Sequence, residues 1–117
     1  MEIKFKVLCP AGYQVDDISN DNIDINIIVN DGNVYFGTLF TISNIISLME
    51  GSIEPYFWST DLLIVKDLSI HTILFSIDSI IRESSLEMVF SNIGRIEDIY
   101  PNKIDFESIT EYFGSDI

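Results

Sequence analysis

Two residues in the sequence, His71 and Cys9, are of types that act in catalysis or bind metal ions. His71 is the only histidine, and without a cysteine or a second histidine at metal-ligand spacing a structural or surface role is favoured. Cys9 precedes Pro10 without a local catalytic motif, and a thiol nucleophile needs a base to activate it. Because the histidine lies far along the chain from Cys9, we expect that the protein is not an enzyme.

Carboxylates provide a second kind of candidate chemistry. Asp16 with Asp17 and Glu97 with Asp98 are neighbouring pairs, but a catalytic pair needs one pKa raised by burial. The aspartates from Asp16 to Asp24 could hold calcium, yet they lack the alternating ligand positions and central glycine of an EF-hand loop. The six glycines are scattered and form no phosphate loop. We therefore expect no cofactor and no metal ion.

Aromatic and acidic residues mix between positions 50 and 61, and this stretch is the best candidate for a protein interface. Tyrosine and tryptophan are favoured at binding hot spots, and carboxylates beside them would complement a basic partner. An alternative is that the aromatic side chains fill the core, which we expect for Phe57 and leave open for the other two. The candidate partner-binding residues are Asp16, Asp17, Glu50, Glu54, Tyr56, Trp58 and Asp61.

The net charge limits the classes of partner. The chain has 117 residues with 19 acidic against 6 basic side chains, a formal charge of −13. This charge disfavours nucleic-acid binding and would steer a basic protein toward the surface. Alternatively, the charge only keeps an isoleucine-rich protein in solution. With 47% hydrophobic residues the chain can fill one core, so residues 1–117 are expected to form a single domain.

The sequence also bears on the compartment. A single cysteine cannot form an internal disulfide, the first residues lack the pattern of a signal peptide, and no apolar run approaches 18 residues. We therefore expect a cytoplasmic protein that does not enter a membrane, and the oligomeric state stays open between monomer and dimer.

Periodicity predicts an α+β fold with a small, largely antiparallel sheet of about four strands packed with three to four helices. Three of the strands are expected at 2–8, 23–29 and 33–39, with a hairpin turn at Asn30, Asp31 and Gly32. The apolar run ending at Val65 predicts a fourth, central strand, 61–65, covered on both faces.

Four helices are expected. One begins after Thr41 or Ser43 and ends with Gly51 as a left-handed residue; a second spans 68–82. Two more are predicted at 85–92, ended by Gly94, and from Asp105 to Phe113. Residues 96–101 fit either a short edge strand or a loop.

Two segments together resemble a known family. VYFGTLFTISNIISLM at 34–49, followed by YFWSTDLLIVKDLSIHTI at 56–73, is similar to the small cytosolic immunity proteins that accompany bacterial polymorphic or contact-dependent toxins. The resemblance covers roughly half of the chain and rests on the succession of aromatic residues, Asp61, an apolar strand, Asp67 and a helix. It implies tight binding to a cognate toxin domain, often a nuclease, by an acidic surface that covers a basic active site.

The sequence therefore favours a non-catalytic inhibitor of a basic protein toxin. One alternative is an adaptor or regulatory domain that binds a protein without inhibiting it. A second alternative is a small hydrolase-like enzyme, which would require a pocket where His71, Cys9 or a carboxylate pair converge.

Overall fold

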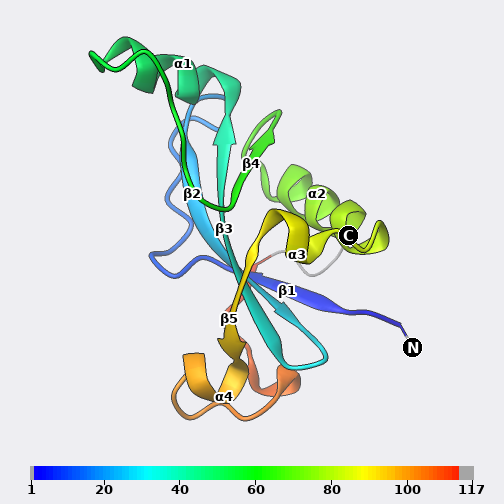
Figure 1. The fold of residues 1–117 in the computed structure, drawn as a ribbon. Coiled ribbons are helices and arrows are strands. Elements are labelled where there is room, and N and C mark those ends of the chain that lie inside the picture. Colours follow the sequence, from blue (N-terminus) through cyan, green and yellow to red (C-terminus); the bar gives the residue numbers. More distant parts are fainter. Residues whose placement is uncertain (1, 114–117) are drawn as a thin grey trace.

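A long strand at positions 33–41 lies at the centre of a five-stranded sheet in the computed structural model, which describes residues 2–113 (Figure 1). The strands are β1 (Phe5–Leu8), β2 (Asn22–Val29), β3 (Asn33–Thr41), β4 (Leu62–Val65) and β5 (Ser91–Arg95). The helices are α1 (Ile42–Glu50), α2 (Ile70–Arg82), α3 (Leu86–Val89) and α4 (Ile96–Ile99), followed by a 3-10 turn at Phe106–Ser108. The predicted α+β class is confirmed.

Both edges of β3 are paired. On one side it forms an antiparallel hairpin with β2, whose turn has Gly32 at φ +95°, and β2 pairs in turn with β1. On the other side β3 is shared, since residues 38–41 pair in parallel with β4 while residues 33–36 pair antiparallel with β5. The sheet order is therefore β1-β2-β3-β4, with β5 completing the same edge as β4.

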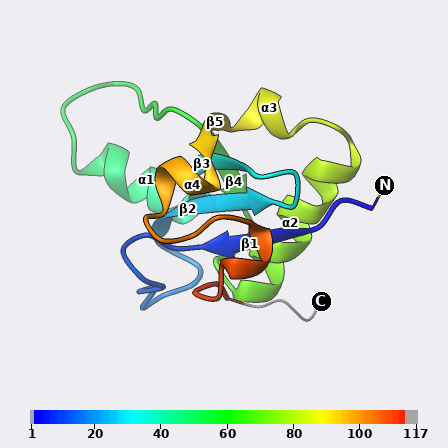
Figure 2. The same ribbon diagram turned by 90° about the horizontal axis from the view of Figure 1, so that it is seen from below.

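The main core lies between one face of the sheet and α2 (Figure 2). Ser69 caps α2 by accepting a hydrogen bond from the Thr72 N–H, and Ile73, Leu74 and Ile77 are buried on its inner side. Their spacing of one and three to four residues produces the apolar stripe of an amphipathic helix. The predicted helix at 68–82 is confirmed, with its start two residues later.

A smaller core covers the other face of the sheet near the β2–β3 hairpin. Its buried members are Ile28, Val34, Ile96, Phe106 and Ile109. The Nζ of Lys6 helps to hold the C-terminal segment there, because it donates to the carbonyls of Phe106 (2.8 Å) and Ile109 (2.9 Å). With both faces covered, β2 is buried from Ile25 to Val29, so the simple alternation that predicted this strand does not describe its burial.

The strand predicted at 61–65 is present, but the predictions of its central position in the sheet and of its burial on both faces are wrong. β4 lies at an edge of the sheet and is not central. Val65 is buried, but Ile64 is 46% exposed, so the strand is not covered on both faces. A continuous apolar run does not distinguish a buried strand from one whose outer edge is open.

The region after residue 85 departs most from the helical prediction. Only one turn, α3, forms, and the chain then extends as β5 along the vacant half of β3. Gly94 does not end a helix; it lies in β5 with φ +137°, next to a bulge that shifts the pairing. Tertiary pairing to β3 overrides the helical spacing here.

Other local expectations are also corrected. Residues 96–99 form the short helix α4, neither strand nor loop, and the helix predicted from Asp105 is only a 3-10 turn. Gly51 follows α1 with φ −85°, so it is not left-handed. The first strand begins at Phe5 and not at residue 2.

The packing of Phe90 on Gly37 generates a stability prediction. A Cβ at Gly37 would lie 2.2 Å from the Phe90 ring, so Gly37→Ala forces the buried ring to move. We expect a loss of about 1 to 3 kcal/mol in the free energy of unfolding, measured by urea denaturation. The control is Gly51→Ala, where a Cβ meets its nearest atom at an ordinary 3.5 Å. Equal stability of the two variants would contradict this packing.

Candidate protein-binding arm

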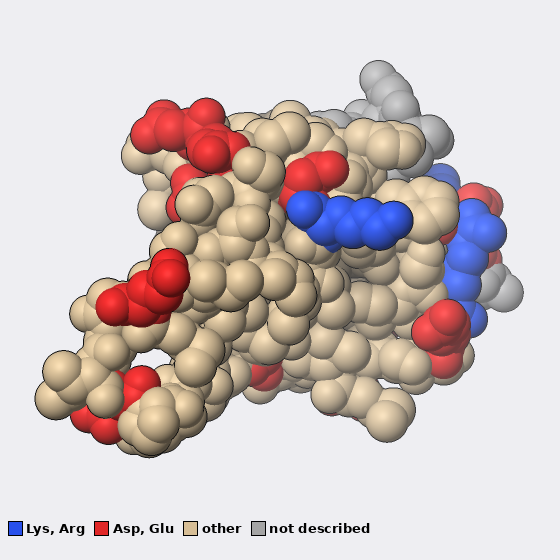
Figure 3. Space-filling view, turned by 90° about the horizontal axis from the view of Figure 1, so that it is seen from above, with Lys and Arg blue, Asp and Glu red and all other residues tan. Residues whose placement is uncertain are grey.

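Residues 42–61, here named the arm, project from the sheet and return to it (Figure 1). The arm exists because β3 and β4 are parallel, so the chain must leave the end of β3 and come back to begin β4 beside Thr38. In most such crossovers the helix covers the sheet, but α1 has no buried residue at all. Figure 3 shows the arm standing out from the body, with an opening between α1 and the returning chain.

The base of the arm is held by several contacts. The Thr41 hydroxyl caps α1 by accepting from the Asn44 N–H (3.2 Å), and the Asn22 side chain donates to the Asn44 side-chain oxygen (2.8 Å). On the returning chain the Phe57 ring packs edge-on against Phe40, with 5.2 Å between centroids. The arm is therefore fixed at its two ends, while residues 51–56 are exposed throughout.

Apolar side chains on the arm are exposed. Ile42, Ile46 and Met49 form a stripe at spacings of four and three residues, which is the pattern of a helix face that packs on another surface. Ile53 at the tip is 99% exposed. Fully burying a side chain of this size against another surface would contribute about 1.5 to 3 kcal/mol.

The three consecutive aromatic side chains at 56–58 point in alternating directions, as is expected along an extended chain. Phe57 points to the core and covers Phe40, whereas Tyr56 and Trp58 on either side are 57% and 71% exposed. Phe57 itself is half-buried and belongs to neither buried cluster, so the expectation that it fills the core holds only in that it covers the buried Phe40. For Tyr56 and Trp58, the alternative that they fill the core is wrong.

Charge on the arm and around it is of one sign. Residues 7–65 contain no lysine, arginine or histidine, and Glu50 and Glu54 lie on the exposed part of the arm. Acidic side chains gather along the arm and in a separate patch beside it, while the basic ones in the same view lie on the body (Figure 3). The eight acidic residues of this stretch are Asp16, Asp17, Asp21, Asp24, Asp31, Glu50, Glu54 and Asp61.

The predicted interface residues fall into three places. Glu50, Glu54, Tyr56 and Trp58 are exposed on the arm, and the structure brings these together on one projection. Asp61 lies at its base with φ +53°, where its carboxylate accepts a hydrogen bond from the Ser91 hydroxyl (2.7 Å) and its carbonyl accepts from the Thr38 N–H. Asp61 therefore holds the end of the arm in place.

Asp16 and Asp17 are on the loop between β1 and β2, outside the arm. The Asp17 carboxylate accepts from the backbone and hydroxyl of Ser19, and these hydrogen bonds lower the pKa of Asp17. The loop touches the base of the arm where the Asp21 carbonyl accepts from the Thr41 N–H (3.2 Å). Sequence reasoning did not anticipate the apolar stripe of α1 as exposed surface, although its spacing was visible.

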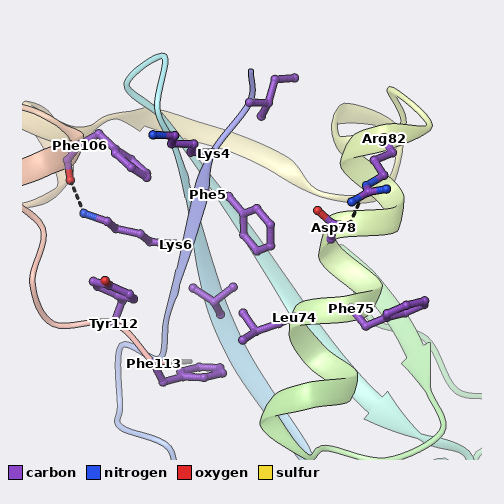
Figure 4. A pocket seen from close by; sticks show the side chains of 12 residues that line it. Lys4, Phe5, Lys6, Leu74, Phe75, Asp78, Arg82, Phe106, Tyr112 and Phe113 are labelled. Carbon is purple, nitrogen blue, oxygen red and sulfur yellow. Dashed lines mark hydrogen bonds and ion pairs between the residues drawn. The ribbon is translucent and has the colours of Figure 1, made fainter. Parts of the chain in front are cut away.

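A groove of about 360 Å³ lies beside β1, with α2 on one side and Phe106 and Tyr112 on the other (Figure 4). Phe5 points toward α2 and Lys6 points to the opposite side, toward the Phe106 carbonyl, and both side chains line the groove. The carboxylate that lines it, Asp78, is paired with Arg82 at 2.8 Å. Its walls are mixed, because Lys4, Lys6 and Arg82 line it together with apolar side chains, and neither His71 nor Cys9 is among the lining residues.

The remaining candidate groups do not converge. His71 is exposed on α2 near Phe75, and Cys9 is half-buried beside the main core. Within residues 2–113 no group of three or more histidine, cysteine or acidic side chains is arranged to hold a metal ion. No helix in the same range is long and apolar enough to cross a membrane.

Comparisons with protein-family models, with curated proteins and with solved structures find no match for this chain. The fold and the arm are therefore interpreted from their own geometry and chemistry.

The exposure of Trp58 leads to a fluorescence prediction. Trp58 is the only tryptophan, so the emission of the folded protein reports on the arm alone. We expect an emission maximum close to that of free tryptophan in water and efficient quenching by acrylamide, because most of the indole meets solvent. A blue-shifted emission protected from acrylamide would contradict the exposed position; the urea-unfolded chain is the reference.

Burial raises the pKa of the Cys9 thiol from 9.0 to about 11, which predicts low reactivity. The thiolate is the nucleophile, so at pH 8.5 alkylation by iodoacetamide should be about a hundredfold slower in the folded protein than in the urea-unfolded chain. The rate should rise with pH through about 11 when folded and through about 9 when unfolded. Equal rates in the two states at pH 8.5 would contradict the burial.

Proposed function

We propose that this protein is a non-catalytic immunity protein that binds a cognate, basic bacterial toxin domain, such as a nuclease, and neutralises it through the arm. The observation that carries the proposal is the arm itself, which combines an unpartnered apolar stripe, two exposed aromatic side chains and charge of only one sign. Tryptophan and tyrosine are enriched at the hot spots of protein interfaces, and charged residues are usual at their polar rim.

Each component of the arm has a separate part in binding. Trp58 and the stripe of α1 supply apolar surface that is removed from water when the partner binds. Glu50 and Glu54, together with the formal charge of −13, attract a basic partner and speed the encounter. A projecting, acidic and partly apolar arm fits a concave basic site, such as the active site of an enzyme that binds an anionic substrate.

The direct test is co-expression with the product of the neighbouring upstream gene. We expect the two proteins to co-purify and the toxicity of that product to be suppressed. Absence of both binding and rescue would overturn the proposal. Binding without rescue would instead favour the adaptor function.

Variants of the arm locate the interface. Trp58→Ala should weaken binding by about 2 kcal/mol or more, roughly thirtyfold in Kd, because an exposed anchor is removed without disturbing the core. The matched control is Met88→Ala on α3, where a still more exposed apolar side chain (85%) lies outside the arm. Titration calorimetry measures both, and an unchanged Kd for Trp58→Ala would exclude the arm as the interface.

A charge-reversal variant distinguishes long-range electrostatic attraction of the partner from direct contact at the interface. Glu54→Lys should slow association and flatten its dependence on salt, measured by stopped-flow mixing at several NaCl concentrations. The control Glu83→Lys makes the same charge change at the far end of α2. Asp61 is not used because its hydrogen bond to Ser91 makes it structural. A wild-type on-rate that does not respond to salt would argue against steering.

A further inference from the structure

The returning chain of the arm, residues 55–59, has backbone groups without hydrogen-bond partners. Within residues 2–113, no hydrogen bond joins an N–H or C=O group of this segment to another part of the chain. The nearest backbone hydrogen bonds lie outside it. Before the segment the Glu54 N–H donates to the Ser52 hydroxyl (3.1 Å), and after it the Asp61 carbonyl accepts from the Thr38 N–H (2.9 Å).

The same segment has the side-chain alternation of a β-strand, although it pairs with no strand of the sheet. Phe57 packs on Phe40, whereas Tyr56 and Trp58 are exposed on the opposite side. In an extended chain the N–H and C=O groups point sideways, at right angles to the side chains and alternately to the two edges. The contact of Phe57 with Phe40 therefore anchors a short extended segment whose backbone edges are both unpaired.

α1 does not cover this segment. Figure 3 shows an opening between α1 and the returning chain, and no hydrogen bond in the described part of the chain joins the two. An extended segment with unpaired edges is the kind of site to which a binding partner adds a strand, since main-chain hydrogen bonds then supply affinity and alternate side chains supply specificity.

Building on the proposed function, we propose that an extended segment of the basic toxin domain pairs with residues 55–59 as an added β-strand. Neighbouring strands share their faces, so every second side chain of the added strand lies beside Tyr56 and Trp58. Lysine or arginine at these alternate positions would pack over the aromatic rings as cation–π partners. Residues 7–65 hold no basic side chain that would repel them.

Charge also argues against a second copy of this chain as the occupant. The arm, residues 42–61, contains acidic side chains and no basic ones. Two arms brought together would place like charges beside each other in molecules that already have a formal charge of −13 each. A basic strand meets no such repulsion.

Hydrogen exchange at residue resolution, followed by NMR, tests the pairing on the wild-type protein. The free protein is compared with the complex that it forms with the product of the neighbouring upstream gene. Amides of alternate residues point to the same edge, so binding should slow either Tyr56 and Trp58 or Phe57 and Ser59 by about tenfold or more relative to the other pair. The Thr38 amide, already bonded to the Asp61 carbonyl, is the internal reference and should not change.

Two exchange patterns would overturn the pairing and leave the proposed function in place. If all of the amides at 56–59 slow equally, the segment is buried by the partner without strand pairing. If none of them slows while toxicity is suppressed, the contact lies elsewhere. Absence of any complex or rescue would overturn the proposed function, and the strand pairing with it.

Substitutions at Tyr56 test the chemistry of the added strand. Tyr56→Leu removes the ring but keeps an apolar side chain, so the Kd should rise about threefold relative to Tyr56→Phe, which keeps the ring face. Tyr56 is 57% exposed, so neither change disturbs the core. Titration calorimetry measures both variants, and equal Kd values would overturn the assignment of basic side chains to the alternate positions.

Discussion

The shared edge of β3 is the constraint on which the rest of the structure depends. Its second half pairs in parallel with β4 and its first half pairs antiparallel with β5. These two segments are far apart in the sequence, and they occupy different halves of the same edge of β3. The parallel pairing requires a crossover that leaves the sheet and returns, and residues 42–61 form it. The antiparallel pairing brings Phe90 over Gly37, where the absence of a side chain leaves room for the ring.

The crossover is unusual because it contributes little to the core. The main core is built from β1, β2, β3, β4 and α2, and α1 adds no buried residue to it. The residues that anchor the crossover and those that it exposes are therefore different: Phe57 anchors the returning chain on Phe40, and its neighbours on both sides face solvent. Such a division allows the exposed residues to change with little effect on the fold.

Electrostatics and apolar area act at different ranges on this surface. The field of the acidic charge on the arm and on the loop beside it extends over about a Debye length, roughly 8 Å at physiological salt. In the proposed function this field would favour a basic partner before contact, and the exposed aromatic and aliphatic side chains would supply most of the binding free energy on contact.

The sequence alone determined those features that depend on local spacing and turn chemistry. Alternation and the Asp-Gly turn predicted the β2–β3 hairpin, and helical spacing predicted α2. These follow from the periods of strand and helix, which neighbouring residues fix by themselves.

Only the tertiary structure decided which apolar stripes are covered. The stripe of α1 has the same spacing as that of α2, yet α2 meets the sheet and α1 does not, because the parallel crossover carries α1 past the end of β3. Residues 91–95 became a strand because half of the β3 edge was vacant. Distant segments determine which strands pair and which strand edges stay unpaired, so no local sequence pattern predicts them.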